Sequence, residues 1–188
     1  PIDRQLTTDL LEFDDLHINS VNAQLSRGKA EKLMMAGIGG IAGSLAKMSM
    51  DMVLFMNQNF NLMSLNDDFT TGSSIMPHKK NPDVLELMRG KTARVISDLN
   101  RLQILLKGLP LAYNRDLQED KEPIFDSVET LIILLPALIG MVETAKFNEK
   151  VISSGAQAEF ALATEIADYL AKKAVPFAQA HEAAGECV

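Results

Sequence analysis

The sequence predicts an all-α protein: an elongated bundle of long helices, followed by the start of a small C-terminal helical domain. Of its 188 residues, 47% are hydrophobic, with ten Met, no Trp and few aromatic residues. This composition suits a helical protein better than a sandwich or barrel. Apolar residues recur at every third or fourth position along three long stretches. No stretch alternates with period two over a useful length, so we expect no sheet beyond an isolated pair of strands.

The first long helix is expected from Ser20 to Asn59, after a short helix near Thr7–Phe13. Its apolar residues are separated by four and three positions in turn, which is the spacing of a coiled-coil seam. They are Met34, Ile38, Ile41, Leu45, Met48, Met52 and Phe55. Glycines near Gly39–Gly40 would each weaken a helix by up to about 1 kcal/mol. We interpret them as a tight packing point for a neighbouring helix; a kink or break there is the alternative.

Two further long helices are expected, one from Pro82 to about Lys107 and one from about Glu122, with Gly108–Pro110 as the stop between them. Their seams repeat the same spacing: Leu85, Met88, Thr92, Val95, Leu99, Leu102 and Leu106 in the first, and Ile124, Val128, Leu131, Leu135, Leu138 and Val142 in the second. Pro136 lies inside the third helix and should bend it. A 3.5-residue period favours near-parallel packing at shallow angles.

The pattern breaks from residue 147 to residue 155, after which two shorter helices are expected at about Ala156–Lys173 and Pro176–Cys187. We therefore expect two domains. Residues 1–154 form the central long-helix bundle, and residues 155–188 begin the C-terminal helical domain.

The length of the first helix predicts an oligomer. A continuous helix from Ser20 to Asn59 would span roughly 60 Å at about 1.5 Å per residue. A compact chain of this size has a diameter of only about 40 Å. The helix would project beyond a single core, and its apolar seam would need a partner chain to cover it.

The charge of the chain narrows the class of partner. A net charge of −7 argues against nucleic acid as the main partner. Five cations nevertheless stand against two anions between Lys79 and Arg94, as a multiply anionic small substrate would require. Three of these cations, Arg89, Lys91 and Arg94, are expected merely to solvate a helix face.

Two features favour a cytoplasmic protein. The lone Cys187 cannot form an internal disulfide, which fits a reducing compartment. No signal peptide is evident. The most hydrophobic runs, near Leu33–Phe55 and Leu131–Met141, are interrupted by polar residues, glycine or Pro136, so we expect no membrane span.

Residues 70–86 contain the stretch on which the functional prediction rests. A polar turn and a lysine pair share one loop: Gly72, Ser73, Ser74, Lys79 and Lys80. Asn81–Pro82 is a strong helix start, with Asn81 as the N-cap and Pro82 at the first helical position. Backbone N–H groups and the positive helix end favour anions there. Such a loop can hold a carboxylate and stabilise negative charge that develops beside it; a solvated loop ahead of a helix is the alternative.

Residues 72–82 read Gly-Ser-Ser-Ile-Met-Pro-His-Lys-Lys-Asn-Pro, which resembles GSSxMPxKxNP, the signature of the fumarase/aspartase/argininosuccinate lyase superfamily. Within it, residues 79–87 are similar to the KKNPDxLEL version of argininosuccinate lyases, and residues 107–121 resemble their KGLP…YNxDLQEDKE tract. Residues 163–170 and 176–185 look like the ATDLADYL and PFxxAHEAAG segments of that family. The resemblance covers nearly the whole chain.

Two departures from the family pattern stand out. His78 occupies a position where many members have Gln; we interpret it as a loop variant, with a catalytic role as the alternative. Intact lyases of the family are more than twice as long. Their N-terminal half carries further substrate contacts and a catalytic His, and no position here matches that segment. The chain thus looks like the central part of a lyase and the start of its C-terminal domain, inactive alone.

The resemblance implies reversible elimination of argininosuccinate to fumarate and arginine, a step of arginine biosynthesis, with no cofactor and no metal. It assigns the base to Ser73 and stabilisation of the charged intermediate to Lys79. The substrate-binding positions it implies are Asn81, Tyr113, Gln118 and Lys121. Ser74 supports the site, and Glu86 positions Lys79 or the loop. A polar loop with a helix cap is the alternative for the residues from Tyr113 to Lys121.

The resemblance also implies a homotetramer whose active sites combine the signature loop of one subunit with segments of others, and that loop is expected to close over the substrate.

Two alternatives to the lyase function remain open. Lyases of this family serve as lens crystallins, so a non-catalytic structural relative would retain the same motifs. The second alternative is another fumarate-producing lyase, such as adenylosuccinate lyase. The tract from Tyr113 to Lys121 argues against this alternative.

Overall fold

The computed structural model describes residues 2–156 and 162–187. Its elements are α1 (Arg4–Leu10), α2 (Ser20–Leu25), α3 (Lys29–Met56), β1 (Met63–Ser64), the 3₁₀ helix η1 (Asp67–Phe69), α4 (Asp83–Leu106), the 3₁₀ helix η2 (Arg115–Asp120), α5 (Lys121–Thr144), β2 (Lys146–Phe147), α6 (Glu149–Ala156), α7 (Ala163–Lys172) and α8 (Phe177–Glu186). The all-α class is confirmed. Two compact units divide the chain: one holds residues up to 53 with 67–143, the other residues 54–66 with those from 144 onward.

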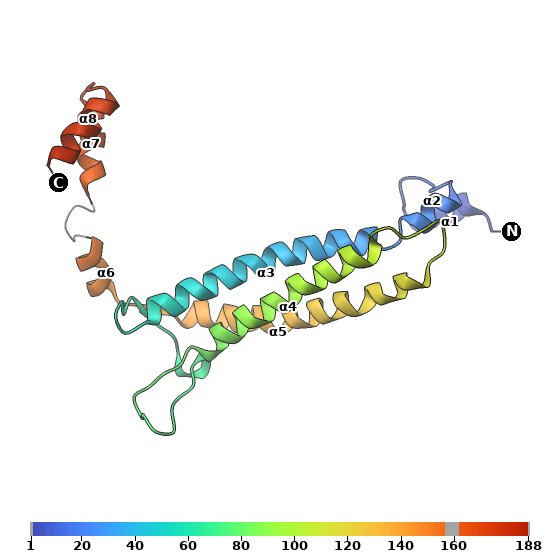
Figure 1. Ribbon diagram of the computed structural model, residues 1–188, viewed down its shortest axis with the longest axis horizontal. Coiled ribbons are helices and arrows are strands. Elements are labelled where there is room, and N and C mark those ends of the chain that lie inside the picture. The colour runs from blue at the N-terminus through green and yellow to red at the C-terminus, as the bar shows by residue number, and fades with distance from the viewer. Residues whose placement is uncertain (1, 157–161, 188) are drawn as a thin grey trace. The chain divides into compact units, whose positions relative to one another are not determined.

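Three long helices of the first unit, α3, α4 and α5, lie side by side along their lengths (Figure 1). Met35, Leu102 and Ile124, one residue from each helix, form a buried cluster. Ile38, Leu99, Leu105 and Val128 pack against it. The predicted seam of α4 is confirmed, because Leu85, Met88, Thr92, Val95 and Leu102 are all buried.

The first long helix is not continuous, which corrects the prediction from Ser20 to Asn59. α2 ends at Leu25 and α3 begins at Lys29. Gly28 between them has a φ of +77°, a left-handed conformation that glycine adopts readily. α3 then runs unbroken through Gly39–Gly40, so the alternative of a helix break there is wrong. At Gly39 an added Cβ would lie 3.2 Å from Leu99 Cδ2, which confirms close helix packing. The 28 residues of α3 span about 42 Å rather than 60 Å.

The buried face of α3 agrees with the predicted seam at Leu45 and Met52 and is shifted by one position elsewhere. Met35, Ala42, Leu45, Ser49 and Met52 are buried. Four members of the predicted seam are instead exposed by between 38% and 50%: Met34, Ile41, Met48 and Phe55. Small residues allow close approach of the neighbouring helix, so the inward face includes Ala42 and Ser49 beside the larger Met35, Leu45 and Met52. Ser49 Oγ satisfies its hydrogen-bonding capacity by donating to the Leu45 carbonyl at 2.8 Å.

α5 follows its predicted seam in its first half only. Ile124 is buried, and Val128 packs on the core. Further along, Leu134 and Met141 are buried while the predicted positions Leu135 and Val142 are exposed. Ser127, Leu134 and Met141 are seven residues apart, so the buried face keeps a heptad spacing that lies one position before the predicted seam. Pro136 lies inside the helix, as predicted.

In the second unit, β1 and β2 form the expected isolated pair, with Met63 opposite Phe147 and Ser64 opposite Lys146. α6 occupies Glu149–Ala156, where only a break was predicted. α7 and α8 pack through three buried alanines, Ala167, Ala180 and Ala184. The first of these two short helices begins at Ala163 rather than Ala156, and residues 157–161 lie outside the described residues. The domain boundary after residue 154 stays a prediction.

Much apolar helix surface is open in the single chain. The stretches Ser20–Met56 and Arg115–Thr144 have the length and apolar composition of membrane-crossing helices. Core helices of soluble proteins meet the same requirement. Only 28% and 33% of the most apolar windows of these stretches are buried. Exposed apolar area on this scale is normally covered by another surface.

Candidate active site

The loop of residues 72–80 is closed at its base by a single β-bridge. Thr71 N donates to the Asn81 carbonyl at 3.0 Å, and Asn81 N donates to the Thr71 carbonyl at 2.8 Å. This bridge overturns the predicted cap. Because the backbone of Asn81 is held in the bridge, the N-cap of α4 is Pro82, without a side-chain cap, and the helix begins at Asp83.

Side chains fasten the base of the loop to the bundle. Phe69 packs on Gly140 of α5, where an added Cβ would approach the ring to 2.5 Å. Lys80 forms an ion pair with Asp67, and Thr71 Oγ1 donates to Asp83. Sequence reasoning missed all three contacts, since each joins residues far apart in the chain or in separate elements.

Ser73 lies half-buried in the loop, and its hydroxyl oxygen is the acceptor of two backbone N–H groups. The amide of Ile75 donates to Ser73 Oγ at 3.3 Å and that of Met76 at 3.1 Å. Two converging N–H donors stabilise negative charge on an oxygen and so favour the deprotonated hydroxyl. This arrangement suits a serine that acts as a base.

The two lysines of the loop differ in their surroundings. Lys80 pairs with Asp67, whereas Lys79 is exposed and forms no ion pair with any residue in the described part of the chain. Lys79 is therefore the cation that remains available to a ligand. Glu86 is also exposed and does not pair with Lys79 in the described ranges, so its supporting role stays a prediction. Ser74 is exposed too.

The start of α4 already carries acidic residues. Asp83 and Glu86 both lie in its first turn, where carboxylates complement the positive end of the helix dipole. Binding of a substrate anion at this helix end therefore stays a prediction.

The remaining predicted site residues lie around η2. α4 stops where expected: Gly108, with a φ of +74°, follows Lys107. The predicted polar loop after it is instead partly helical, because η2 takes up Arg115–Asp120. Tyr113 is 61% exposed, with the Arg27 guanidinium 5.3 Å from its ring centroid. Gln118 is exposed, and Lys121 forms an ion pair with the buried Asp120.

Ion pairs also hold η2 in place. Arg101 Nη2 donates to Glu119 at 2.9 Å and to Glu122 at 3.0 Å. The hydrogen bond that Arg101 donates to Glu122 is the main cause that raises the pKa of the Arg101 guanidinium above its ordinary value. Leu117 is buried beneath the same segment.

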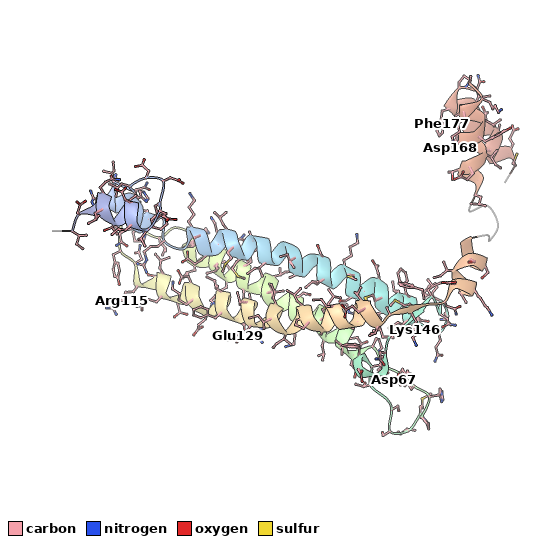
Figure 2. The ribbon with its side chains drawn as sticks, turned by 180° about the vertical axis from the view of Figure 1, so that it is seen from behind. Asp67, Arg115, Glu129, Lys146, Asp168 and Phe177 are labelled. Carbon is pink, nitrogen blue, oxygen red and sulfur yellow. The ribbon has the colours of Figure 1, made fainter. Side chains whose placement is uncertain are left out.

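The structure does not bring the two sets of predicted site residues together. The loop that carries Ser73 precedes α4, and the segment with Tyr113 follows it. The 24 residues of α4 span about 36 Å. Figure 2 shows the two ends, with Asp67 beside the loop and Arg115 at the opposite end of the bundle. One chain therefore holds the two sets of predicted site residues at opposite ends of α4, and we call these sets the two predicted half-sites.

Polar contacts fix α4 against α5 between these ends. Arg94 forms an ion pair with Asp126, which corrects the expectation that it merely solvates a helix face. Ser127 Oγ, fully buried, donates to Asp98 at 2.9 Å. Burial is the main cause that raises the pKa of the Asp98 carboxyl above its ordinary value, with the nearby Asp126 adding to the shift.

Sequence reasoning also missed Arg27 and the cationic pocket that it lines. The pocket has a volume of about 290 Å³ and lies between the α2–α3 junction and the connection from α4 to η2. The turn residues Ser26, Arg27 and Gly28 between two helical patterns were the signal that could have marked this junction.

Among the described residues, no group of three His, Cys, Asp or Glu side chains is arranged to hold a metal ion.

Comparison with known proteins defines the class. Residues 2–97 match the family model described as Lyase, and residues 160–188 match the one described as Argininosuccinate lyase C-terminal. Since the first match alone covers half of the chain, the chain belongs to the lyase family.

Curated relatives and solved structures show which proteins of this class the chain resembles. The chain is 49% identical to the argininosuccinate lyase of Frankia casuarinae over 189 residues and 48% identical to that of Renibacterium salmoninarum over 188 residues. Each alignment covers 100% of this chain but only 40% of the relative. The fold matches EDDS lyase in complex with formate, with a TM-score of 0.73 and 25% identity over 98% of this chain and 37% of that one.

A second solved structure, the fumarate lyase:delta crystallin from Brucella melitensis bound to cobalt, has a TM-score of 0.66 and 22% identity. The match covers 95% of this chain and 38% of that one. At this identity the likeness concerns the fold alone.

Proposed function

We propose that this chain carries the central part of an argininosuccinate lyase, which reversibly eliminates fumarate from argininosuccinate and leaves arginine. The observation that carries the proposal is the near-50% identity to curated argininosuccinate lyases along the entire chain. The loop geometry supports it independently, because the same loop offers a serine oxygen with two N–H donors and a lysine, Lys79, that forms no ion pair with another described residue.

In the proposed reaction, Ser73 removes the proton from the succinyl carbon next to a carboxylate. Its hydroxyl is a weak base at its normal pKa, so it must be held close to the alkoxide. The N–H groups of Ile75 and Met76 support this, since they donate to the oxygen that would carry the charge. Removal of the proton leaves a doubly charged carboxylate intermediate. The C–N bond then breaks, with the electron pair going to the guanidino nitrogen, which takes a proton to give arginine.

Lys79 stabilises the intermediate, because it is the cation of the loop that no described carboxylate neutralises. Asn81 offers its side-chain amide to a substrate carboxylate. The loss of the predicted capping role favours this assignment, since the amide does not cap α4. Ser74 and Glu86 support the loop. The elimination needs no cofactor.

Tyr113, Gln118 and Lys121 bind the substrate from the other half-site. Lys121 supplies charge, and the other two supply neutral hydrogen bonds. Since a helix of about 36 Å separates them from Ser73 within one chain, a complete site takes its loop from one copy and these residues from another.

We further infer that the protein is a homotetramer of the cytoplasm that works in arginine biosynthesis. The open apolar stripe of α3 and the two separated half-sites both support assembly. Sedimentation of the native full-length protein at micromolar concentration tests this inference. A stable, active monomer would contradict it.

The activity is tested by mixing the full-length protein with argininosuccinate and following fumarate by its ultraviolet absorbance. A parallel sample with adenylosuccinate separates the two lyase activities. Fumarate from argininosuccinate alone is the expected result. Fumarate from adenylosuccinate alone would indicate an adenylosuccinate lyase instead. Release of fumarate from neither substrate would favour a crystallin-like structural relative.

A further inference from the structure

The pocket near Tyr113 begins with an unusual turn. Gly28 is buried with a positive φ, and a Cβ at this position would lie 2.4 Å from Leu106 Cδ2. The turn is closed by Arg27 N donating to the Gln24 carbonyl at 3.3 Å and Lys29 N donating to the Ser26 carbonyl at 3.1 Å. Glycine thus lets the α2–α3 junction pack directly on the end of α4, and this contact places the side chain of Arg27 beside Tyr113.

The lining of the pocket is cationic. Arg27, Lys29 and Lys32 contribute to it, together with Asn114 and apolar residues, and none of its lining residues is acidic. None of these three cations forms an ion pair with another described residue. In a chain with a net charge of −7, an un-neutralised group of three cations is a local site for an anion.

The pocket adjoins the predicted substrate residue Tyr113. Its neighbours on both sides, Ala112 and Asn114, line the pocket. The Arg27 guanidinium lies 5.3 Å from the Tyr113 ring centroid, within the range of a cation–π contact. Most of the Tyr113 surface is exposed. The neighbouring Asn114 is held in place because its Nδ2 donates to the Pro110 carbonyl at 2.7 Å.

We propose that this pocket binds a carboxylate of the substrate and that Arg27 is the residue that orients Tyr113 at its edge. The proposal rests on the proposed function, because argininosuccinate carries several carboxylates and the reacting end is bound elsewhere. A volume of about 290 Å³ lies at the lower limit for small-ligand sites, so the pocket accommodates one end of the substrate. Lys29 and Lys32 attract the carboxylate, and Arg27 both binds it and stacks on the ring.

The first experiment removes the pocket charge. In the full-length enzyme, Lys29→Gln combined with Lys32→Gln should raise KM for argininosuccinate about fivefold or more, with kcat nearly unchanged, because binding is lost equally from ground and transition states. The matched control is Lys47→Gln combined with Lys172→Gln, two exposed lysines outside the pocket. Equal KM values for the two double variants would overturn the assignment of the pocket.

The second experiment tests the stacking. Arg27→Gln should raise KM about tenfold in the wild-type and in the Tyr113→Phe backgrounds, since both keep the aromatic ring. In the Tyr113→Leu background the same change should cost about threefold or less. An equal effect in all three backgrounds would remove the positioning role of Arg27. If the wild-type enzyme released no fumarate from argininosuccinate, the proposed function would be wrong. The assignment of an argininosuccinate carboxylate to the pocket would then be wrong as well.

Discussion

The two half-sites of this chain differ in how they are held. The loop of residues 72–80 is exposed except for Ser73, and the base of the loop is closed by one bridge and the Lys80–Asp67 ion pair. The segment around η2 is anchored by ion pairs from Arg101 and by the buried Leu117. From this difference we predict that the loop moves onto the substrate while the segment around η2 provides a fixed surface, which is how lids over active sites commonly work.

The sharpest test of the loop is Ser73→Ala in the full-length enzyme. We expect kcat to fall by about 10³ or more, because the group that takes the proton is removed. Thermal stability should stay nearly constant, since Ser73 makes only local contacts. Ser74→Ala is the matched control, and its effect should be much smaller. Turnover close to that of the wild type in Ser73→Ala would exclude Ser73 from the mechanism.

Mixing experiments test whether the half-sites meet across chains. Ser73→Ala and Lys121→Ala enzymes should each be nearly inactive, because each lacks one half-site in every copy. After dissociation and joint reassembly, about a quarter of the sites should combine an intact loop with an intact segment and regain activity. Reassembly of each variant alone is the control. Activity that never returns in the mixture would indicate that one chain supplies both residues.

Hydrogen exchange distinguishes the mobile half-site from the fixed one. Amides from Thr71 to Lys80 should exchange rapidly in the free full-length enzyme and become several-fold slower with fumarate bound, as the loop closes. Amides from Arg115 to Asp120 should change little. Equal protection of the loop with and without fumarate would count against closure.

The smallest expected effect concerns Asp98, on the helix that separates the half-sites. The pKa of its carboxyl is raised mainly by burial, which means that the folded state favours the protonated form. The stability that this preference contributes is complete below the ordinary pKa of 3.8. It is lost as pH rises through the raised pKa. Asp98→Asn keeps an acceptor for Ser127. We expect the melting temperature at pH 7 to increase by about 1–2 °C, with a weaker decline in stability as pH rises from acid.

Asp126→Asn is the control for that change. It breaks the ion pair with Arg94 and should leave the melting temperature equal or lower. A melting temperature for Asp98→Asn below that of the wild type at pH 7 would show that the charged carboxylate is stabilising in place.

Local sequence determined much of this protein. Helical spacing without period-two alternation predicted the all-α class, and Gly108–Pro110 predicted the end of α4. The seam of α4 was predicted correctly because its buried positions are nearly all apolar. The serine and lysine of the loop were predicted as site residues because the signature motif spans only eleven consecutive residues, 72–82, and can be recognised without tertiary information.

The tertiary structure decided what depends on distant contacts. The inward face of α3 includes Ala42 and Ser49, and Leu99 of α4 approaches Gly39, so this face differs from the predicted seam at several positions. Asn81 is not the cap of α4, because a bridge to Thr71 fixes its backbone first. The packing of Gly28 on Leu106 brings Arg27 over Tyr113. Each arrangement joins residues from different elements, and only packing can specify such contacts, since local spacing carries no information about which elements become neighbours.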